Sequence, residues 1–453
     1  MSRSKNFLLL FLLLVAHTIA TDAANRDILR TKMSTKTVYA SPGSSPPDAS
    51  TKTSTSESTR DETCTPVQLN FVLRHGTRNP TLKDIKRIQH VHSKLVGQTQ
   101  DASVSWLHSW HNPYPIEKEA WLADRGVQEL VDLGKRLRAH LSPSLPVGFR
   151  SSDDFVFEHT WKLRTRQSAH AFAFGFFHGH QPVYYHEHPT GDDALLRFYD
   201  NCPRFARQIE TNHSAIKEHH NYRASQAMHE NLVKFQHVTN VSDATQDDME
   251  AAYAACAFDV AVQDVYDQWC SFFDDAMLLS FDYMHDLKHF YRKSHGHALS
   301  YEIATPLLQT MFRTLKERVD GQKHVKGYFR FAHAETILPL ASLLNVSYFD
   351  RHVSDRAGHF RAETPLELAL ERPFKSSELA PFSANIGFVL YECATEKKQG
   401  PDRSTFKVKT LLNEREVIFD ECRGQALCPF DVLENRFRMW IYELDFYQHC
   451  ALA

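Results

Sequence analysis

Apolar runs of strand length alternate with helical stretches along most of the chain. Short runs rich in apolar and β-branched residues predict strands, and longer segments with apolar residues every three or four positions predict helices. The predicted strands cover residues 67–73, 155–157, 325–332, 385–391 and 405–412. The predicted helices cover residues 82–95, 126–141, 160–177 and 336–344, with a helical tail that reaches residue 450. Strands that alternate with helices favour an α/β fold with a central sheet.

The helix predicted at 126–141 carries one apolar stripe, whose expected role is packing against the core. The stripe consists of Val127, Leu130, Leu133, Leu137 and Leu141. Residues from about 195 to 296 are also helix-like, but they are polar and rich in His, Asp and Gln, which suits an insert better than a sheet. We therefore expect a central mixed sheet flanked by helices, with a smaller α-helical cap domain inserted at about 195–296.

The N-terminal region predicts two segments outside this fold. Residues 1–24 have the pattern of a signal peptide, because Arg3 and Lys5 precede a short apolar run that small residues follow. The run is short for a membrane span, so we expect cleavage rather than an uncleaved anchor, and no stable membrane insertion afterwards. Residues 25–62 are rich in Ser, Thr and Pro and predict a disordered segment. The folded domain is expected at 63–453.

The charge balance and the histidine content exclude some classes of partner. The 453 residues carry a formal net charge of −3, and the sequence pI is ≈ 6.8, so no overall positive field favours nucleic acid. Histidine is abundant, with 27 copies, but no His-Glu-x-x-His or paired Cys-x-x-Cys pattern accompanies it. We therefore predict no metal site and no other cofactor, and we expect a monomer.

Two features agree with passage through an oxidising secretory compartment. Sequons predict N-glycosylation at Asn212, Asn240 and Asn345. Eight cysteines are an even number that can pair there, although their spacing alone leaves the connectivity open. They are Cys64, Cys202, Cys256, Cys270, Cys393, Cys422, Cys428 and Cys450. The C-terminal residues 451–453 are no Lys-Asp-Glu-Leu-like retrieval signal, so a secreted product is expected, with the vacuole or the ER lumen as alternatives.

Polar packets follow two strands that lie far apart in the sequence. Residues 74–78 (Arg-His-Gly-Thr-Arg) follow the strand at 67–73, and residues 333–335 (His-Ala-Glu) follow the strand at 325–332. Arg164 lies at a third junction between a strand and a helix. Because ligands of open α/β sheets bind beyond the carboxyl ends of strands, we expect these packets to share one crevice.

These side chains suit phosphate chemistry. The guanidiniums of Arg74, Arg78 and Arg164 can grip phosphate oxygens, and their positive charge keeps His75 neutral and nucleophilic. Gly76 allows a close backbone approach or a positive φ. Glu335 can then protonate the leaving group and activate water, while His333 donates to the phosphoryl oxygens.

Each packet also has a purely structural interpretation. An Arg-His-Gly turn occurs without chemistry, Glu335 could simply favour a helix start, and Arg164 could be a solvated surface charge. Occurrence of all three at strand-to-helix junctions favours a common site. Another pair, His285-Asp286, lies within a helical pattern and follows no strand, so we reject it as the proton donor.

The segments FVLRHGTRNP and FRFAHAET resemble the signature pair of the histidine acid phosphatases, in the branch of the multiple inositol polyphosphate phosphatases. The resemblance extends from about residue 64 to residue 450 and implies the histidine phosphatase fold. It implies His75 as nucleophile and Glu335 as proton donor. It implies four phosphate ligands, Arg74, Arg78, Arg164 and His333. It also implies the disulfide pairs Cys64 with Cys393, Cys202 with Cys450, Cys256 with Cys270, and Cys422 with Cys428.

The implied activity is hydrolysis of inositol polyphosphates such as phytate through a phosphohistidine intermediate. Lys83 and Lys86 lie one helical turn beyond the nucleophile and could contact further phosphates, or they could form a solvated helix face. Two other interpretations stay open: a broad-specificity acid phosphatase, including one acting on 2,3-bisphosphoglycerate, and a non-catalytic secreted glycoprotein with the same fold.

Overall fold

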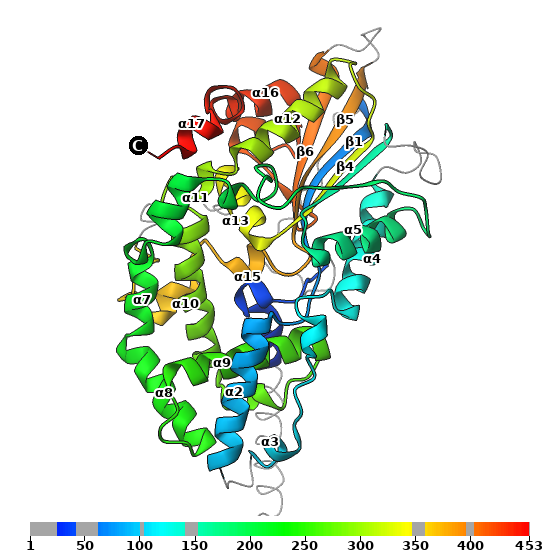
Figure 1. Cartoon of the computed structure of the whole chain (residues 1–453). Helices are drawn as coiled ribbons and strands as arrows, with labels where there is room; N and C mark the ends of the chain where they lie inside the picture. Colours follow the sequence, from blue (N-terminus) through cyan, green and yellow to red (C-terminus); the bar gives the residue numbers. More distant parts are fainter. Residues whose placement is uncertain are drawn as a thin grey trace, which may run out of the picture.

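A computed structural model describes residues 25–41, 62–99, 104–140, 153–346, 358–395 and 403–452. The predicted signal peptide at 1–24 lies outside these residues, as do positions 42–61 of the predicted disordered segment and Leu141 of the apolar stripe. Figure 1 shows a sheet with helices on both faces and, beside it, a larger group of helices.

The sheet is mixed, and its order is β3-β2-β4-β1-β5-β6-β7, with β8 paired to β6. The strands β1, β2, β3 and β4 are mutually parallel, whereas β5 runs antiparallel to β1 and the later strands continue in antiparallel fashion. The bounds are β1 Glu62–Arg74, β2 Phe155–His159, β3 Tyr185–Glu187, β4 Gly327–Ala332, β5 Asn385–Thr395, β6 Phe406–Leu412, β7 Arg415–Val417 and β8 Leu427–Pro429. All five predicted strands are present. The three additional strands have three residues each, too few for a recognisable pattern.

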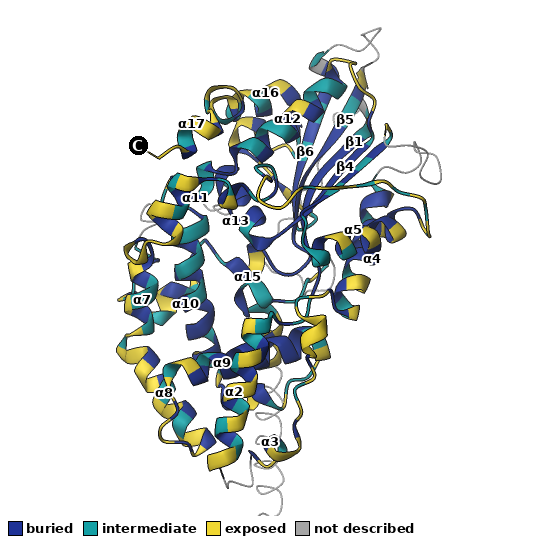
Figure 2. Cartoon of the chain, viewed as in Figure 1, coloured by how far each residue is buried: buried dark blue, intermediate teal, exposed yellow. Residues whose placement is uncertain are grey.

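Alternation along β1 directs its side chains to two cores. Leu69, Phe71 and Leu73 face α4 and α5, whereas Val72 faces the other core. Helices α4 (Asp124–Ala139) and α5 (Leu163–Phe176) lie together on one side of the sheet, while α12 (Thr305–Val319) and α13 (Ala334–Leu343) pack into the second core. Figure 2 shows the strands between them as buried.

The stripe predicted on α4 needs one correction. Leu130, Leu133 and Leu137 are fully buried, but Val127 is 41% exposed. Val127 stays exposed because the contact between α4 and α5 is centred on glycines and not on this residue. A side chain at Gly134 would meet the backbone of α5, and one at Gly175 would meet the backbone of α4.

The second group of helices is larger than the predicted insert. Residues 195–296 supply α6 to α10, but α2, which follows β1 directly, joins the same group by packing against α9. The bounds are α2 Leu82–Gln98, α3 Trp106–Ser109, α6 Pro203–Phe205, α7 Lys217–Arg223, α8 Gln226–Thr239, α9 Gln246–Phe258 and α10 Asp275–Lys293. The remaining helices include α11 Leu299–Glu302, α14 Leu366–Leu370, α15 Ser376–Leu379, α16 Phe430–Arg436 and α17 Phe446–Cys450.

Residues 25–41 are structured, in contrast to the disorder predicted for the whole of 25–62. Residues 25–31 are helical, and a 3-10 turn follows at Ser34–Lys36. Leu29 and Met33 are each 1% exposed, so this stretch contributes apolar side chains to the core. Its largely polar composition gives no sign of this contribution. Tyr39 hydrogen-bonds to Glu414 at 2.7 Å. The N-terminal segment, defined here as residues 25–41, is therefore part of the folded unit.

Four disulfides join the pairs that the family resemblance implies, and two of them, Cys64 with Cys393 and Cys202 with Cys450, link distant parts of the chain. Cys64 and Cys393 are register partners on β1 and β5, which explains how strands separated by more than 300 positions can be joined directly. Disulfides of this kind form in oxidising compartments. Within the described ranges, none of the helices has both the length and the apolar character that a membrane span requires.

Candidate active site

The two polar packets lie side by side because β1 and β4 are parallel neighbours. Arg74 pairs in register with Ala332, and the His75 backbone N–H donates to the Ala332 carbonyl at 3.1 Å. The rings of His75 and His333 are 5.6 Å apart between centroids. Residues from both packets therefore lie together beyond the carboxyl ends of these strands.

A close backbone contact fixes the loop after β1. A Cβ atom at Gly76 would lie 2.5 Å from the Gly126 carbonyl oxygen of α4, so only glycine fits. Gly76 has no positive φ, which leaves close approach as its function. Glu129 of α4 accepts hydrogen bonds from the Thr77 N–H at 2.9 Å and from the Thr77 hydroxyl at 2.8 Å. Helix α4 thus holds the loop in place.

The geometry of His75 leaves one ring nitrogen available as a nucleophile. Its Nδ1 lies 2.9 Å from the Gly76 carbonyl oxygen. Because a carbonyl can only accept, Nδ1 carries the proton of the neutral ring and Nε2 holds the free lone pair. Burial lowers the pKa of His75 well below its usual value, and the charges of Arg164, Arg74 and Arg78 lower it further. Burial and these charges therefore favour the neutral, nucleophilic form of His75.

Three arginines surround this histidine. Arg74 donates through Nη1 to the carbonyls of Thr35 and Ala380, each at 2.6 Å, and its guanidinium lies 4.5 Å from the centroid of the Phe382 ring. Burial lowers the pKa of Arg74 to about 9, and it lowers that of Arg164 to about 10.

The arginines have unused hydrogen-bonding capacity. The Nε atoms of Arg74, Arg78 and Arg164 are buried, and none has an acceptor among the described residues. Like charges also oppose one another here, because Arg78 lowers the pKa of both Arg74 and Arg164. A bound oxyanion would supply acceptors and compensating charge, so the three side chains suit a phosphate group.

His333 contacts Arg164 and Thr160 within the protein. Its Nδ1 lies 3.3 Å from Arg164 Nη2, and its Nε2 lies 3.0 Å from the Thr160 hydroxyl. A guanidinium only donates, so Nδ1 accepts and Nε2 carries the proton. Both ring nitrogens are thus used within the protein, and in this state His333 orients Arg164. The sequence did not indicate Thr160 as a partner of His333, because no local pattern distinguishes this residue.

Glu335 lies in the first turn of α13 and is paired with a lysine from the helical group. Lys293, the last residue of α10, donates to its carboxylate at 2.8 Å, and the Glu335 side chain is 44% exposed. Desolvation raises the pKa of Glu335, but Lys293 outweighs it, with a smaller contribution from His333, and the pKa is well below its usual value. The carboxylate is therefore ionised in the free protein.

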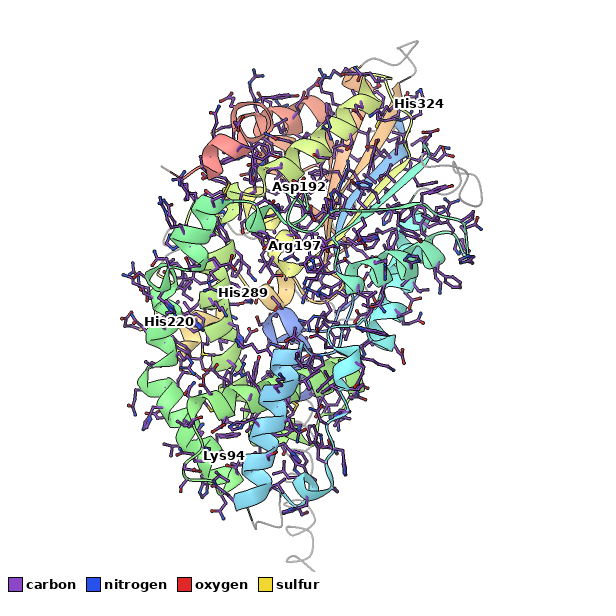
Figure 3. The ribbon with its side chains drawn as sticks, in the orientation of Figure 1. Lys94, Asp192, Arg197, His220, His289 and His324 are labelled. Carbon is purple, nitrogen blue, oxygen red and sulfur yellow. A yellow bond between two sulfur atoms is a disulfide. The ribbon has the colours of Figure 1, made fainter. Side chains whose placement is uncertain are left out.

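Another basic group, Arg197, is near the middle of the molecule, whereas Lys94 and His324 are at its periphery (Figure 3). The charge of Arg197 lowers the pKa of His333 and that of Arg164. Positive charge thus extends beyond the three arginines around His75.

Lys83 and Lys86 are both exposed on α2, and neither forms an ion pair with a described residue. The adjacent face of α2 carries Asp84 and Arg87. The carboxylate of Asp84 raises the pKa of Arg78, so Asp84 lies near this arginine. The face of α2 with Asp84 and Arg87 therefore points toward the arginines, and the face with the two lysines does not.

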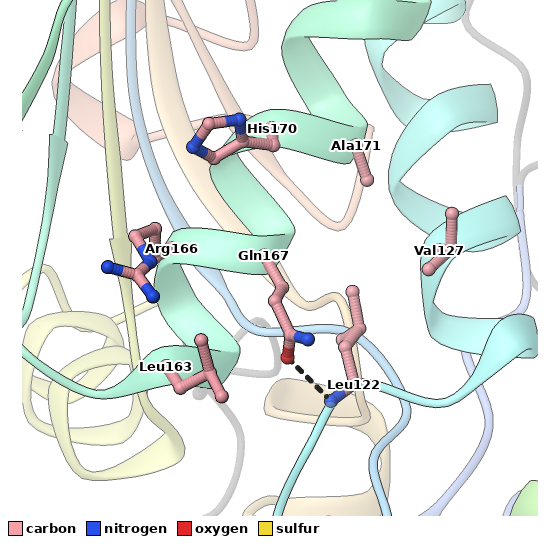
Figure 4. A pocket seen from close by; sticks show the side chains of 7 residues that line it. All are labelled: Leu122, Val127, Leu163, Arg166, Gln167, His170 and Ala171. Carbon is pink, nitrogen blue, oxygen red and sulfur yellow. Dashed lines mark hydrogen bonds between the residues drawn. The ribbon is translucent and has the colours of Figure 1, made fainter.

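Arg166 and Asp286 lie apart from the nucleophile. Arg166 lines a pocket of ≈ 380 Å³ at α4 and α5, together with Gln167, His170 and apolar residues (Figure 4). Asp286 is fully buried, where Arg372 donates to it at 2.7 Å and the Ser376 N–H at 2.9 Å. These contacts occupy its carboxylate, which agrees with its rejection as proton donor. In the parts of the chain that the structure describes, no cluster of His, Cys, Asp and Glu could hold a metal ion.

Comparisons with known proteins give a consistent result. The family model of the histidine phosphatase superfamily (branch 2) matches residues 67–413. The multiple inositol polyphosphate phosphatase 1 of Homo sapiens is 28% identical over 424 residues, which cover 86% of this chain and 82% of the human protein. The protein of the same name from Gallus gallus is 26% identical over 403 residues, which cover 86% and 85% of the two chains.

Solved structures share the fold. The phytase from D. castellii has a TM-score of 0.72 at 16% identity and covers 93% of this chain and 87% of its own. The multiple inositol polyphosphate phosphatase of Bifidobacterium longum, in complex with inositol hexasulfate, has a TM-score of 0.65 at 17% identity and covers 91% and 98%.

A mixed sheet with a neutral histidine among arginines at its carboxyl edge defines a phosphatase of the histidine acid phosphatase type. The chain belongs to the histidine phosphatase superfamily, branch 2.

Proposed function

We propose that the protein hydrolyses phosphomonoesters of inositol polyphosphates through a phosphohistidine intermediate. The observation that carries the proposal is the free Nε2 of His75 beside three arginines with unused donors, with Glu335 in the helix that follows the neighbouring strand β4. The guanidiniums hold the phosphate oxygens and counter the charge that develops during transfer.

In the first step, Nε2 of His75 forms a bond to phosphorus while the bond from phosphorus to the inositol oxygen breaks. The leaving oxygen takes a proton from Glu335. In the second step, a water molecule gives a proton to Glu335 and attacks phosphorus, and the bond from phosphorus to Nε2 breaks. Inorganic phosphate leaves, and Glu335 is protonated again for the next cycle.

The proton on Glu335 depends on Lys293. In the free protein, Lys293 keeps the Glu335 carboxylate ionised. A polyanionic substrate brings negative charge to both groups: it competes for Lys293 and disfavours a second anion at Glu335. Substrate binding therefore raises the pKa of Glu335, so that the carboxyl group can hold the proton that the first step needs.

The choice of substrate rests on the named relatives and on the positive charge around His75. The human and chicken relatives are named multiple inositol polyphosphate phosphatases, and the related structure from B. longum holds inositol hexasulfate. The basic groups Arg197 and Lys293 extend beyond the reacting phosphate. Lys83 and Lys86 are proposed contacts for the outermost phosphates of a large substrate.

Secretion and glycosylation are part of the proposal. The four disulfides support passage through an oxidising compartment. Asn212 and Asn240 are exposed and accessible to glycosylation. Asn345 is less accessible, since it is half-buried with a buried side-chain oxygen.

Purified protein incubated with phytate tests the proposed function. We expect release of inorganic phosphate and a series of lower inositol phosphates, resolved by chromatography. The His75→Ala variant should keep the fold, measured by circular dichroism, and lose this release. Comparable kcat/KM for phytate and small monoesters would favour a broad acid phosphatase. Hydrolysis of small monoesters without hydrolysis of phytate would refute the proposal that inositol polyphosphates are the substrates. Inactivity on all phosphomonoesters would refute the proposal that the protein is a phosphatase.

A further inference from the structure

The N-terminal segment brings one lysine to the arginines of the active site. The Thr35 carbonyl accepts a 2.6 Å hydrogen bond from Arg74, and Lys36 is the next residue. Its ammonium lies 5.8 Å from the centroid of the Phe258 ring, and the guanidinium of Arg78 lies 5.8 Å from the same centroid. Two cations, one from the catalytic loop and one from the N-terminal segment, thus share one aromatic ring.

The position of Lys36 is fixed by the core of the protein. The Ser34 N–H donates to Asp282 at 2.9 Å, and the Phe382 N–H donates to the Thr37 carbonyl at 3.0 Å. Arg372 binds Asp282 and secures it in turn. Lys36 is therefore held between two anchored neighbours and is no part of a free terminus.

The charge at Lys36 lacks a full counter-charge. No described residue forms an ion pair or hydrogen bond with its ammonium, and Asp84 is the acid that acts on it most strongly. Burial lowers the pKa of Lys36, and Arg78, Arg87 and Arg74 lower it further against the effect of Asp84. The arrangement suits a substrate with more than one phosphate, with one phosphate on the unused Nε donors of Arg74 and Arg78 and another beside Lys36.

We propose that Lys36 is a specificity-determining residue that binds a second phosphate of the substrate while His75 attacks the first. This inference rests on the proposed function, because only a substrate with several phosphates can reach both groups. A simple monoester occupies the arginines around His75 and leaves Lys36 without a partner. Lys36 thus favours polyphosphorylated substrates over small ones.

Kinetics of Lys36→Met tests the proposal, because methionine keeps the apolar stem against Phe258 and removes the charge. For phytate, kcat/KM should fall by about tenfold or more, chiefly through KM, as expected for loss of a charge-assisted hydrogen bond. For para-nitrophenyl phosphate, kcat/KM should stay within about twofold. Lys36→Arg should restore much of the activity on phytate.

Lys32→Met is the matched control. Lys32 lies in the same segment and pairs with Glu378 at 2.7 Å, away from Arg78. If this variant loses activity on phytate as strongly as Lys36→Met, the effect comes from loosening the segment, and the proposal is wrong. Equal effects of Lys36→Met on both substrates, or no effect on either, also overturn it.

Chemical labelling of the unaltered protein covers the case in which Lys36→Met does not fold. A lysine-reactive acylating reagent is applied with inositol hexasulfate, with inorganic phosphate, or with no addition, and each lysine is followed by mass spectrometry. Inositol hexasulfate should protect Lys36 and phosphate should not, while Lys32 reacts alike in all three. An unprotected Lys36 overturns the proposal. Failure of the protein to hydrolyse phytate refutes the proposed function instead, because the labelling test measures binding and does not depend on turnover.

Discussion

The contact between the catalytic loop and α4 makes Gly126→Ala the most informative substitution outside the catalytic groups. A Cβ atom at position 126 would lie 2.1 Å from the Thr77 carbonyl oxygen and 2.6 Å from the Thr77 nitrogen. Both are backbone atoms, so no side-chain rotation relieves the clash. Either the loop or α4 has to move by about 1 Å to restore ordinary contact.

The expected effects have two parts. The overpacked contact destabilises by about 1–3 kcal/mol, against which alanine contributes up to about 1 kcal/mol through its better helix propensity. Displacement of the loop also moves His75, two residues before Thr77, and a misplacement of about 1 Å lowers the rate by on the order of 100-fold. Activity should therefore fall much further than stability.

Gly97→Ala provides the matched control, because Gly97 lies in helix α2 and an added Cβ would meet nothing within 4 Å. This variant should gain up to about 1 kcal/mol and keep full activity. The assays are kcat/KM on para-nitrophenyl phosphate and the midpoint of thermal unfolding. If Gly126→Ala has the activity and the midpoint of Gly97→Ala, the loop is not held by α4 and the reasoning fails.

Two further substitutions test the charges and hydrogen bonds around the nucleophile. Arg164→Gln removes a charge that lowers the pKa of His75, so this pKa should rise. The acidic limb of the pH profile of kcat/KM should then lie at higher pH than in the unaltered protein on the same substrate. An unmoved limb would contradict the effect of Arg164 on His75. Glu129→Ala removes the acceptor for Thr77 and for the Ser383 hydroxyl, and it should destabilise by about 1–3 kcal/mol and lower kcat. Urea unfolding and steady-state kinetics measure this, and a variant with unchanged kcat would contradict the role of Glu129.

The placement of the catalytic packets was predictable because it depends on local sequence and one general rule. Residues 74–78 and 333–335 each follow an apolar strand, and parallel neighbouring strands bring their carboxyl ends together. Helices with clear apolar periodicity, such as α2 and α4, were predictable for the same reason. The structured part of the N-terminal segment was not, since its few apolar residues, Leu29 and Met33 among them, have no periodic pattern.

The partners of the catalytic groups could not be predicted from the sequence. Lys293 lies 42 positions before Glu335, and Glu129 lies 52 positions after Thr77, so only the folded chain brings these pairs together. The exposure of Lys83 could not be predicted either, since the rotation of α2 about its axis decides which of its faces points inward, and charge alone cannot specify this rotation.

The covalent intermediate on His75 can be tested directly with the Glu335→Gln variant and para-nitrophenyl phosphate. Nitrophenolate leaves without protonation, whereas attack by water still needs Glu335 as a base, so the phosphorylated enzyme should accumulate. The account predicts a burst of about one nitrophenolate per protein molecule and, after an alkaline quench, phosphate on His75 by mass spectrometry. The account would be contradicted by the absence of both the burst and phosphate on His75, or by phosphate on another residue.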